Sequence, residues 1–254
     1  MATVYLPPGN YGTADFETQN DYVAAGFTGF RGNTLLNALS APICSSLVNV
    51  LSVGTRSITG VGFLGAPSSL SVFLEDSGGQ NITLTLTNCY FASNVFFACF
   101  GSVSINVVLN NCVFADNIYV EAGTFGGIGA SAYVYINHCI VLGEVFLNDS
   151  LGDITATAKN TIINGLAYQT WSFGSGSGVA VNPAVVWPNT TNLLTPINVV
   201  PIKGKVGVIG AGLAYVGMPV MDAAGFSRPF KAVNPCIGPC EYRPAAGAGM
   251  RISA

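Results

Sequence analysis

Short runs of alternating apolar and polar residues fill the middle of the chain and predict β-strands. The runs 82–86 (Ile-Thr-Leu-Thr-Leu) and 105–109 (Ile-Asn-Val-Val-Leu) are rich in β-branched residues, and their period of two is typical of a strand with one buried face. Each run is followed by an Asn-Cys pair, an apolar couple, a polar turn residue and a further apolar triplet. No stretch of helical length shows the 3.6-residue period, so we predict an all-β protein without βαβ crossovers.

This order of residues recurs as an internal repeat. Cys89, Cys112, Cys139 and Thr161 hold equivalent places at spacings of 23, 27 and 22 residues, and the Gly-rich stretch 123–129 is the natural site of the longest insertion. Short strands at such a period predict a solenoid, in which each coil stacks on the previous one and equivalent residues lie about 4.8 Å apart.

The Asn-Cys pairs predict two neighbouring ladders along the solenoid. We expect the thiols to face inward and the residues before them to form a polar ladder, whose amides bond from coil to coil as in cross-β stacks. Asn and Gly at the corners supply the left-handed backbone conformation that tight bends need. The predicted ladder residues are Asn88, Cys89, Asn111, Cys112, His138 and Cys139.

These motifs resemble a known superfamily. The opening Val4–Tyr11 and the Asn-Cys-x-Phe-x-x-Asn coils are similar to pectate-lyase-like parallel β-helix proteins. The order of Asp222-Ala-Ala-Gly-Phe-Ser-Arg228 and Cys236-Ile-Gly-Pro-Cys-Glu241 resembles the closing segment of many bacterial and phage β-helix proteins, where Asp-x-x-Gly-x-x-Arg precedes Asp-Ile-Gly-Ala-x-Glu. Cys236 stands where that ending has Asp and Pro239 where it has Ala, which leaves the local pairing of the cap open. A disulfide between Cys236 and Cys240 is one substitute for that pairing.

The resemblance implies a single-stranded right-handed parallel β-helix with N- and C-terminal caps. We predict one continuous domain, with a cap and first coil at 1–40, β-helix coils at 41–180, and C-terminal coils with a closing cap at 181–254. The superfamily includes lyases, hydrolases, adhesins and virion proteins, so the fold alone does not determine the function.

The composition of the chain limits the classes of function that it can have. Half of the 254 residues are apolar and only 8% are charged, against roughly 25% in an average domain, which suits a protein that lives in an assembly. The net charge is −3 and the nine basic residues are dispersed, which argues against nucleic acid. No apolar run approaches the roughly 18 residues of a membrane span. The N-terminus lacks a secretory signal, so we expect assembly in the cytoplasm of a host.

Candidate catalytic groups are few. Asp116 and Glu144 fall near the same corner of neighbouring coils and could supply the two carboxyl groups of a glycoside hydrolase, although solvated turn residues follow the same pattern. Arg and Lys are absent from residues 57 to 158, so the central coils hold no base for a lyase. His138 and Cys139 are neighbours on a strand and point to opposite faces, which excludes a Cys-His dyad. We predict no metal site and no cofactor.

Aromatic residues cluster in the central coils and indicate a partner. Tyr133 and Tyr135 alternate with apolar residues, which predicts a strand buried on both faces by a neighbouring subunit; with Tyr119 they are the expected contacts of a homotrimer. We therefore predict a structural virion protein of a tailed phage, a trimer that decorates or cements the capsid and contacts the major capsid protein or another virion protein. A tailspike-like polysaccharide hydrolase and a glycan-binding surface adhesin are the alternatives.

Overall fold

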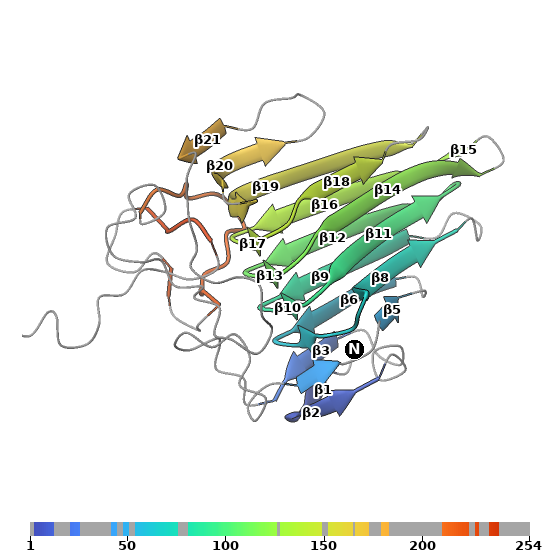
Figure 1. Cartoon of the computed structure of the whole chain (residues 1–254), viewed down its shortest axis with the longest axis horizontal. Coiled ribbons are helices and arrows are strands. Elements are labelled where there is room, and N and C mark those ends of the chain that lie inside the picture. The colour runs from blue at the N-terminus through green and yellow to red at the C-terminus, as the bar shows by residue number, and fades with distance from the viewer. Residues whose placement is uncertain are drawn as a thin grey trace, which may run out of the picture.

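In a computed structural model of the chain, parallel strands stack into a β-solenoid (Figure 1), which confirms the predicted all-β parallel architecture. The regular elements of the described part of the chain are all strands. The structure describes residues 3–12, 21–25, 42–44, 48–50, 54–75, 81–125, 128–148, 152–164, 166–172, 179–182, 210–223, 227–228 and 234–238.

The strands form three faces, and each central coil contributes one strand to each face. The first face contains β1 (Thr3–Leu6), β3 (Asp21–Ala24), β6 (Gly54–Thr59), β9 (Asn81–Thr87), β12 (Ser104–Asn110), β16 (Ser131–Asn137) and β19 (Asp153–Ile163). The second face contains β2 (Gly9–Tyr11), β4 (Pro42–Cys44), β7 (Gly62–Phe63), β10 (Tyr90–Phe91), β13 (Val113–Phe114) and β17 (Ile140–Val141), followed by the end of β19. The third face contains β5 (Val48–Val50), β8 (Ser68–Leu74), β11 (Asn94–Phe100), β14 (Ile118–Phe125) and β18 (Val145–Asn148).

The register of the first face reproduces the repeat seen in the sequence. Ile82, Ile105 and Ala132 are Cα partners on successive parallel strands, at the same spacings of 23 and 27 residues as the cysteines. The longer second spacing contains β15 (Ile128–Gly129), which turns back antiparallel to the end of β14. The Gly-rich insertion is therefore a small hairpin beside the third face.

The interior is filled by the inward half of each alternating strand. Along β9 and β12 every second residue is buried and the residues between are partly exposed, as the pleat of a strand requires. On the second face, the rings of Phe63, Phe91 and Phe114 stack inside the solenoid with centroids 4.9 and 4.7 Å apart. One apolar core therefore runs along the solenoid axis.

The regular stack ends with antiparallel pairing. β20 (Leu166–Ser172) runs antiparallel to β19, and β21 (Val179–Asn182) runs antiparallel to β20. β21 therefore crosses the boundary predicted between residues 180 and 181. The change of direction gives the last strand of the first face a partner without requiring another coil.

The chain then returns along the outside of the second face. We call residues 210–223, 227–228 and 234–238 the C-terminal segment, which lies beside the short strands in Figure 1. It contributes Ala223 and Ile237 to a second apolar cluster, which covers the outward side chains of Val113, Ile140 and Ile162. Within its described residues, the regular pairing is a single bridge between residues 221 and 227. Strands β10, β13 and β17 of the second face are therefore buried on both sides by the chain itself.

Candidate functional site

Four residues at the corner between the first and second faces share an unusual backbone conformation. Asn88, Asn111, His138 and Asn160 have φ values of 53°, 54°, 52° and 49°. Asn adopts this left-handed region more readily than most residues, because its short polar side chain can bond locally. We call these four residues the corner ladder, and it contains the predicted polar positions together with Asn160.

The C-terminal segment binds the corner ladder. The Asn111 Nδ2 donates to the carbonyl oxygen of Met221 at 2.9 Å, and the Arg228 Nη2 donates to the Asn111 Oδ1 at 3.1 Å. The expectation of coil-to-coil amide bonding was therefore wrong for Asn111, because another part of the chain lies across this corner. Such a bond does occur at the preceding position, where Asn137 donates to Asn110 at 3.1 Å.

His138 joins the corner ladder to Arg228 in a fully buried site. The Arg228 Nη1 lies 2.8 Å from the His138 Nδ1, and the Asn160 Nδ2 lies 3.2 Å from its Nε2. An arginine can only donate, so the Nδ1 accepts, and the neutral imidazole carries its proton on Nε2. The Asn160 Nδ2 is also a donor, so it is a close neighbour of the Nε2 and not its hydrogen-bond acceptor. Burial, and then the positive charge of Arg228, lower the pKa of His138 well below its usual value. The histidine therefore anchors the C-terminal segment and is not placed to act as a catalytic base.

The predicted thiols lie inside the solenoid. Cys89, Cys112 and Cys139 are fully buried, and the Cys112 backbone N–H donates to the Cys139 Sγ at 3.3 Å. Thr161 continues the row, because its Oγ1 accepts from the Cys139 N–H at 3.2 Å. Burial raises the pKa of the Cys89 and Cys112 thiols well above the usual value, which keeps them protonated and unreactive.

The two candidate catalytic carboxylates lie at the corner between the second and third faces. The Asp116 Oδ1 accepts from the Asn117 N–H at 3.0 Å, and the Glu144 N–H donates to the Asn117 Oδ1 at 2.9 Å. The Glu144 Oε1 accepts from the Asn164 Nδ2 at 3.2 Å, and its side chain is exposed. The structure therefore brings both residues to one corner of neighbouring coils, where amide groups hold them.

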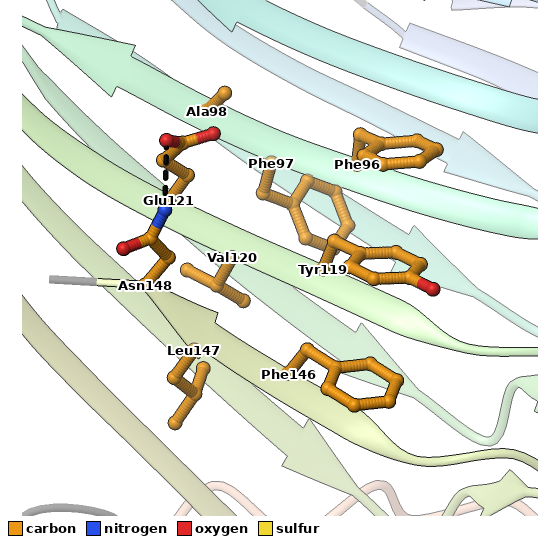
Figure 2. Close-up of a pocket in the computed structure, with 9 residues that line it drawn as sticks. All are labelled: Phe96, Phe97, Ala98, Tyr119, Val120, Glu121, Phe146, Leu147 and Asn148. Carbon is orange, nitrogen blue, oxygen red and sulfur yellow. Dashed lines mark hydrogen bonds between the residues drawn. The ribbon is translucent and has the colours of Figure 1, made fainter.

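The outer side of the third face carries an aromatic ladder, which we define as Phe96, Tyr119 and Phe146. These residues occupy equivalent outward positions of β11, β14 and β18. Their ring centroids are 4.7 and 5.0 Å apart and adjacent planes are within 14° of parallel (Figure 2). Tyr119 therefore has a ring against each of its faces, whereas Phe96 and Phe146 each stack on one side only. The spacings of 23 and 27 residues between these aromatics are a sequence signal that could have identified the ladder.

A groove with a cavity volume of about 350 Å³ lies beside the aromatic ladder. The small side chain of Ala98 follows Phe96 on the outer side of β11, and Glu121 and Asn148 hold the equivalent positions on the next two coils. The Asn148 Nδ2 donates to the Glu121 Oε1 at 3.0 Å (Figure 2). The groove therefore combines aromatic edges on one side with one carboxylate and one amide on the other.

The apolar surface of the third face extends to the preceding coil, and the first face has exposed aromatic residues of its own. Phe73 on β8 is 41% exposed and its ring lies 5.6 Å from that of Phe100 on β11. Tyr133, which is 39% exposed, and Tyr135 lie on the outer side of β16 in the first face. Tyr119 and this tyrosine pair, predicted together as trimer contacts, therefore lie on different faces.

One cysteine of the predicted disulfide lies outside the described residues. Cys236 is buried in the C-terminal segment, whereas Cys240 lies outside the described part of the chain. Among described side chains, no group of three or more His, Cys, Asp and Glu is arranged to hold a metal ion. The described residues also contain no helix whose length and apolar character would let it cross a membrane.

Comparison with protein-family models, with curated proteins and with solved structures returns no match for this chain. The candidate site therefore stands on its own geometry.

Proposed function

We propose that this protein is a structural virion component of a tailed phage that associates as a homotrimer through its third face and stabilises the capsid shell. The mechanism is passive. A rigid solenoid presents a fixed apolar surface, and burial of that surface between subunits provides the free energy of association.

The exposed aromatic surface of the third face is the observation that carries this proposal. Phe146 is 42% exposed at the end of the aromatic ladder, and Phe73 extends the same surface. Aromatic residues are enriched and charged residues are depleted at the centres of protein interfaces. Glu121 is the one carboxylate among the residues that line the groove. A surface of this composition suits contact with a protein.

A polysaccharide hydrolase receives less support from the same contacts. Glycoside hydrolysis needs two carboxyl groups across the scissile bond, one of which a buried environment keeps protonated. Glu144 is exposed and bonded to an amide, and the groove of the third face offers Glu121 alone. The aromatic ladder also suits a glycan platform poorly, because Tyr119 has both ring faces covered.

The proposal is tested by a pair of matched variants. Phe146 and Tyr133 have similar exposure and lie on the same coil, but on the third and first faces respectively. We expect Phe146→Asp to convert the trimer to a monomer in light scattering and Tyr133→Asp to leave the trimer intact, with both variants folded by circular dichroism. A trimer that survives Phe146→Asp and dissociates with Tyr133→Asp would move the interface to the first face.

The hydrolase alternative has its own assay. Purified protein is incubated with capsular and cell-wall polysaccharides, and reducing ends are measured. Cleavage that disappears in Asp116→Ala or Glu144→Ala would contradict a purely structural role. We expect no cleavage by the wild-type protein.

A further inference from the structure

A second exposed apolar surface lies in the C-terminal segment. Residues 213–221 (Leu-Ala-Tyr-Val-Gly-Met-Pro-Val-Met), which we call the apolar loop, contain no charged side chain. Val216 is fully exposed and Val220 is 77% exposed, and the exposed side chains of Leu213 and Met221 flank them. Four large apolar side chains exposed within nine residues are more than the scattered exposure that is normal for a protein surface.

The corner ladder holds both ends of the apolar loop. At its start, the Leu213 N–H donates to the Asn160 Oδ1 at 2.8 Å, and the Asn160 Nδ2 donates to the Leu213 carbonyl oxygen at 2.7 Å. At its end, the Asn111 Nδ2 donates to the Met221 carbonyl oxygen at 2.9 Å. Within the loop, Gly217 has a φ of 83°, a conformation that glycine adopts without strain.

This anchoring fixes the shape of the loop before any contact forms. A segment already held in one conformation loses little conformational entropy on binding, so more of its contact energy appears as affinity. The buried contacts of Asn111, Asn160 and Arg228 therefore serve to present an apolar projection.

A ring of identical subunits needs two different patches on each subunit, one that projects and one that receives, because its contacts are heterologous. The apolar loop projects from the corner between the first and second faces, whereas the groove beside the aromatic ladder lies on the third face. We propose, building on the self-association proposed above, that the apolar loop of one copy docks in the groove of the next copy.

The two surfaces match in polarity and charge. The groove is lined by the aromatic ladder on one side and by Ala98, Glu121 and Asn148 on the other, and its one carboxylate belongs to Glu121. The loop carries no acidic group to repel that carboxylate, and its peptide N–H groups are potential hydrogen-bond donors. A second copy is therefore a better occupant than a sugar, because the central ring of the ladder has no free face, and better than an acidic peptide, which Glu121 would repel.

Complementation between two variants tests this docking directly. Val216→Asp removes the projection and leaves the groove, whereas Phe146→Asp damages the groove and leaves the loop. We expect each variant alone to be monomeric, with the association constant lowered about 30-fold or more. Mixed in equal amounts at high micromolar concentration, the two should form a 1:1 heterodimer in sedimentation velocity, because the mixture contains one intact pair of surfaces. Tyr5→Asp, at a 67% exposed position away from both surfaces, is the matched control.

Each other outcome has a definite meaning. If the wild type associates and Val216→Asp associates equally, the loop is not part of the interface, and the proposed trimer still stands. If both variants are monomeric and their mixture remains monomeric, the loop does not dock in the groove. If the wild type is itself monomeric, the proposed function and this docking both fail.

Discussion

His138 should make the stability of this protein depend on pH between about 5 and 6.5. The imidazole is fully buried, and burial together with the neighbouring Arg228 guanidinium lowers its pKa well below the usual 6.5. Tyr215 stacks on the ring at 5.8 Å, and the Lys159 ammonium lies over that tyrosine and adds a positive charge near the site. Below pH 6.5 the unfolded chain binds a proton at His138 and the folded chain does not, so acid favours unfolding. This contribution to stability is complete above about pH 6.5 and is lost as the pH falls.

The expected magnitude follows from one proton. A difference of one bound proton changes the free energy of unfolding by about 1.4 kcal/mol per pH unit, so the accumulated loss at pH 5 has an upper bound of about 2 kcal/mol. His138 is the one histidine of the chain, and carboxylates ordinarily titrate at lower pH, so little else contributes in this window. His138→Asn is the matched variant, because Asn occupies the equivalent position with positive φ at residues 88, 111 and 160.

The assay is urea unfolding followed by circular dichroism, at pH values from about 7.5 to 5 and at one protein concentration, because association also changes apparent stability. We expect the wild-type free energy of unfolding to decrease below pH 6.5 and that of His138→Asn to remain nearly constant. A wild-type curve without this decrease, or an equal decrease in the variant, would refute the assignment of a neutral, acid-sensitive His138.

Three further results are expected. Cys89, Cys112 and Cys139 should resist alkylation in the native protein and react after addition of urea, because they are fully buried; rapid native labelling of these residues in peptide mass mapping would contradict the inward ladder. Phe91→Ala, which removes the middle ring of the inner stack, should lower the free energy of unfolding by about 3–5 kcal/mol in urea titrations, and a loss below about 1 kcal/mol would show that the stack is not tightly packed. Gly143→Ala should cost about 1–3 kcal/mol in the same titration, because a Cβ there would lie 2.8 Å from a backbone carbon of the neighbouring coil; an unchanged midpoint would contradict that close approach.

The solenoid could be predicted because its information is local and repeated. Alternation of apolar residues decides which side chains of a strand face inward, and the spacing of Cys89, Cys112 and Cys139 gives the length of each coil. The same spacings relate Phe96, Tyr119 and Phe146, so the aromatic ladder could also have been predicted from the sequence.

The number and orientation of the faces could not be predicted in the same way. Tyr119 and Tyr133 both point outward, but they belong to the third and first faces. Alternation specifies in or out within one strand, whereas the direction of each face depends on the bends between strands. Those bends are set by backbone conformations such as the positive φ of Asn111. The sequence indicates that Asn and Gly occupy the corners, but it does not give the angle of each bend.

The path of the C-terminal segment also could not be predicted from the sequence pattern. Asn111 bonds to the carbonyl oxygen of Met221, and His138 bonds to Arg228, across long separations in the chain. Contacts between a side chain and a distant backbone group leave no periodic trace. Burial of a strand on both sides was predicted for the strand of Tyr133 and Tyr135, by a neighbouring subunit, and within the chain Tyr133 is 39% exposed. The chain itself covers both sides of strands on the second face, at Val113 and Ile140, which the sequence pattern did not indicate.

The central claim, that this solenoid is a self-assembling structural protein, is tested most directly by the solution mass of the wild-type protein, measured by light scattering without denaturant. We predict a mass about three times the chain mass of 26.2 kDa, constant over a range of protein concentrations. A well-behaved monomer at every concentration would contradict the claim, and the exposed third face would then require another explanation.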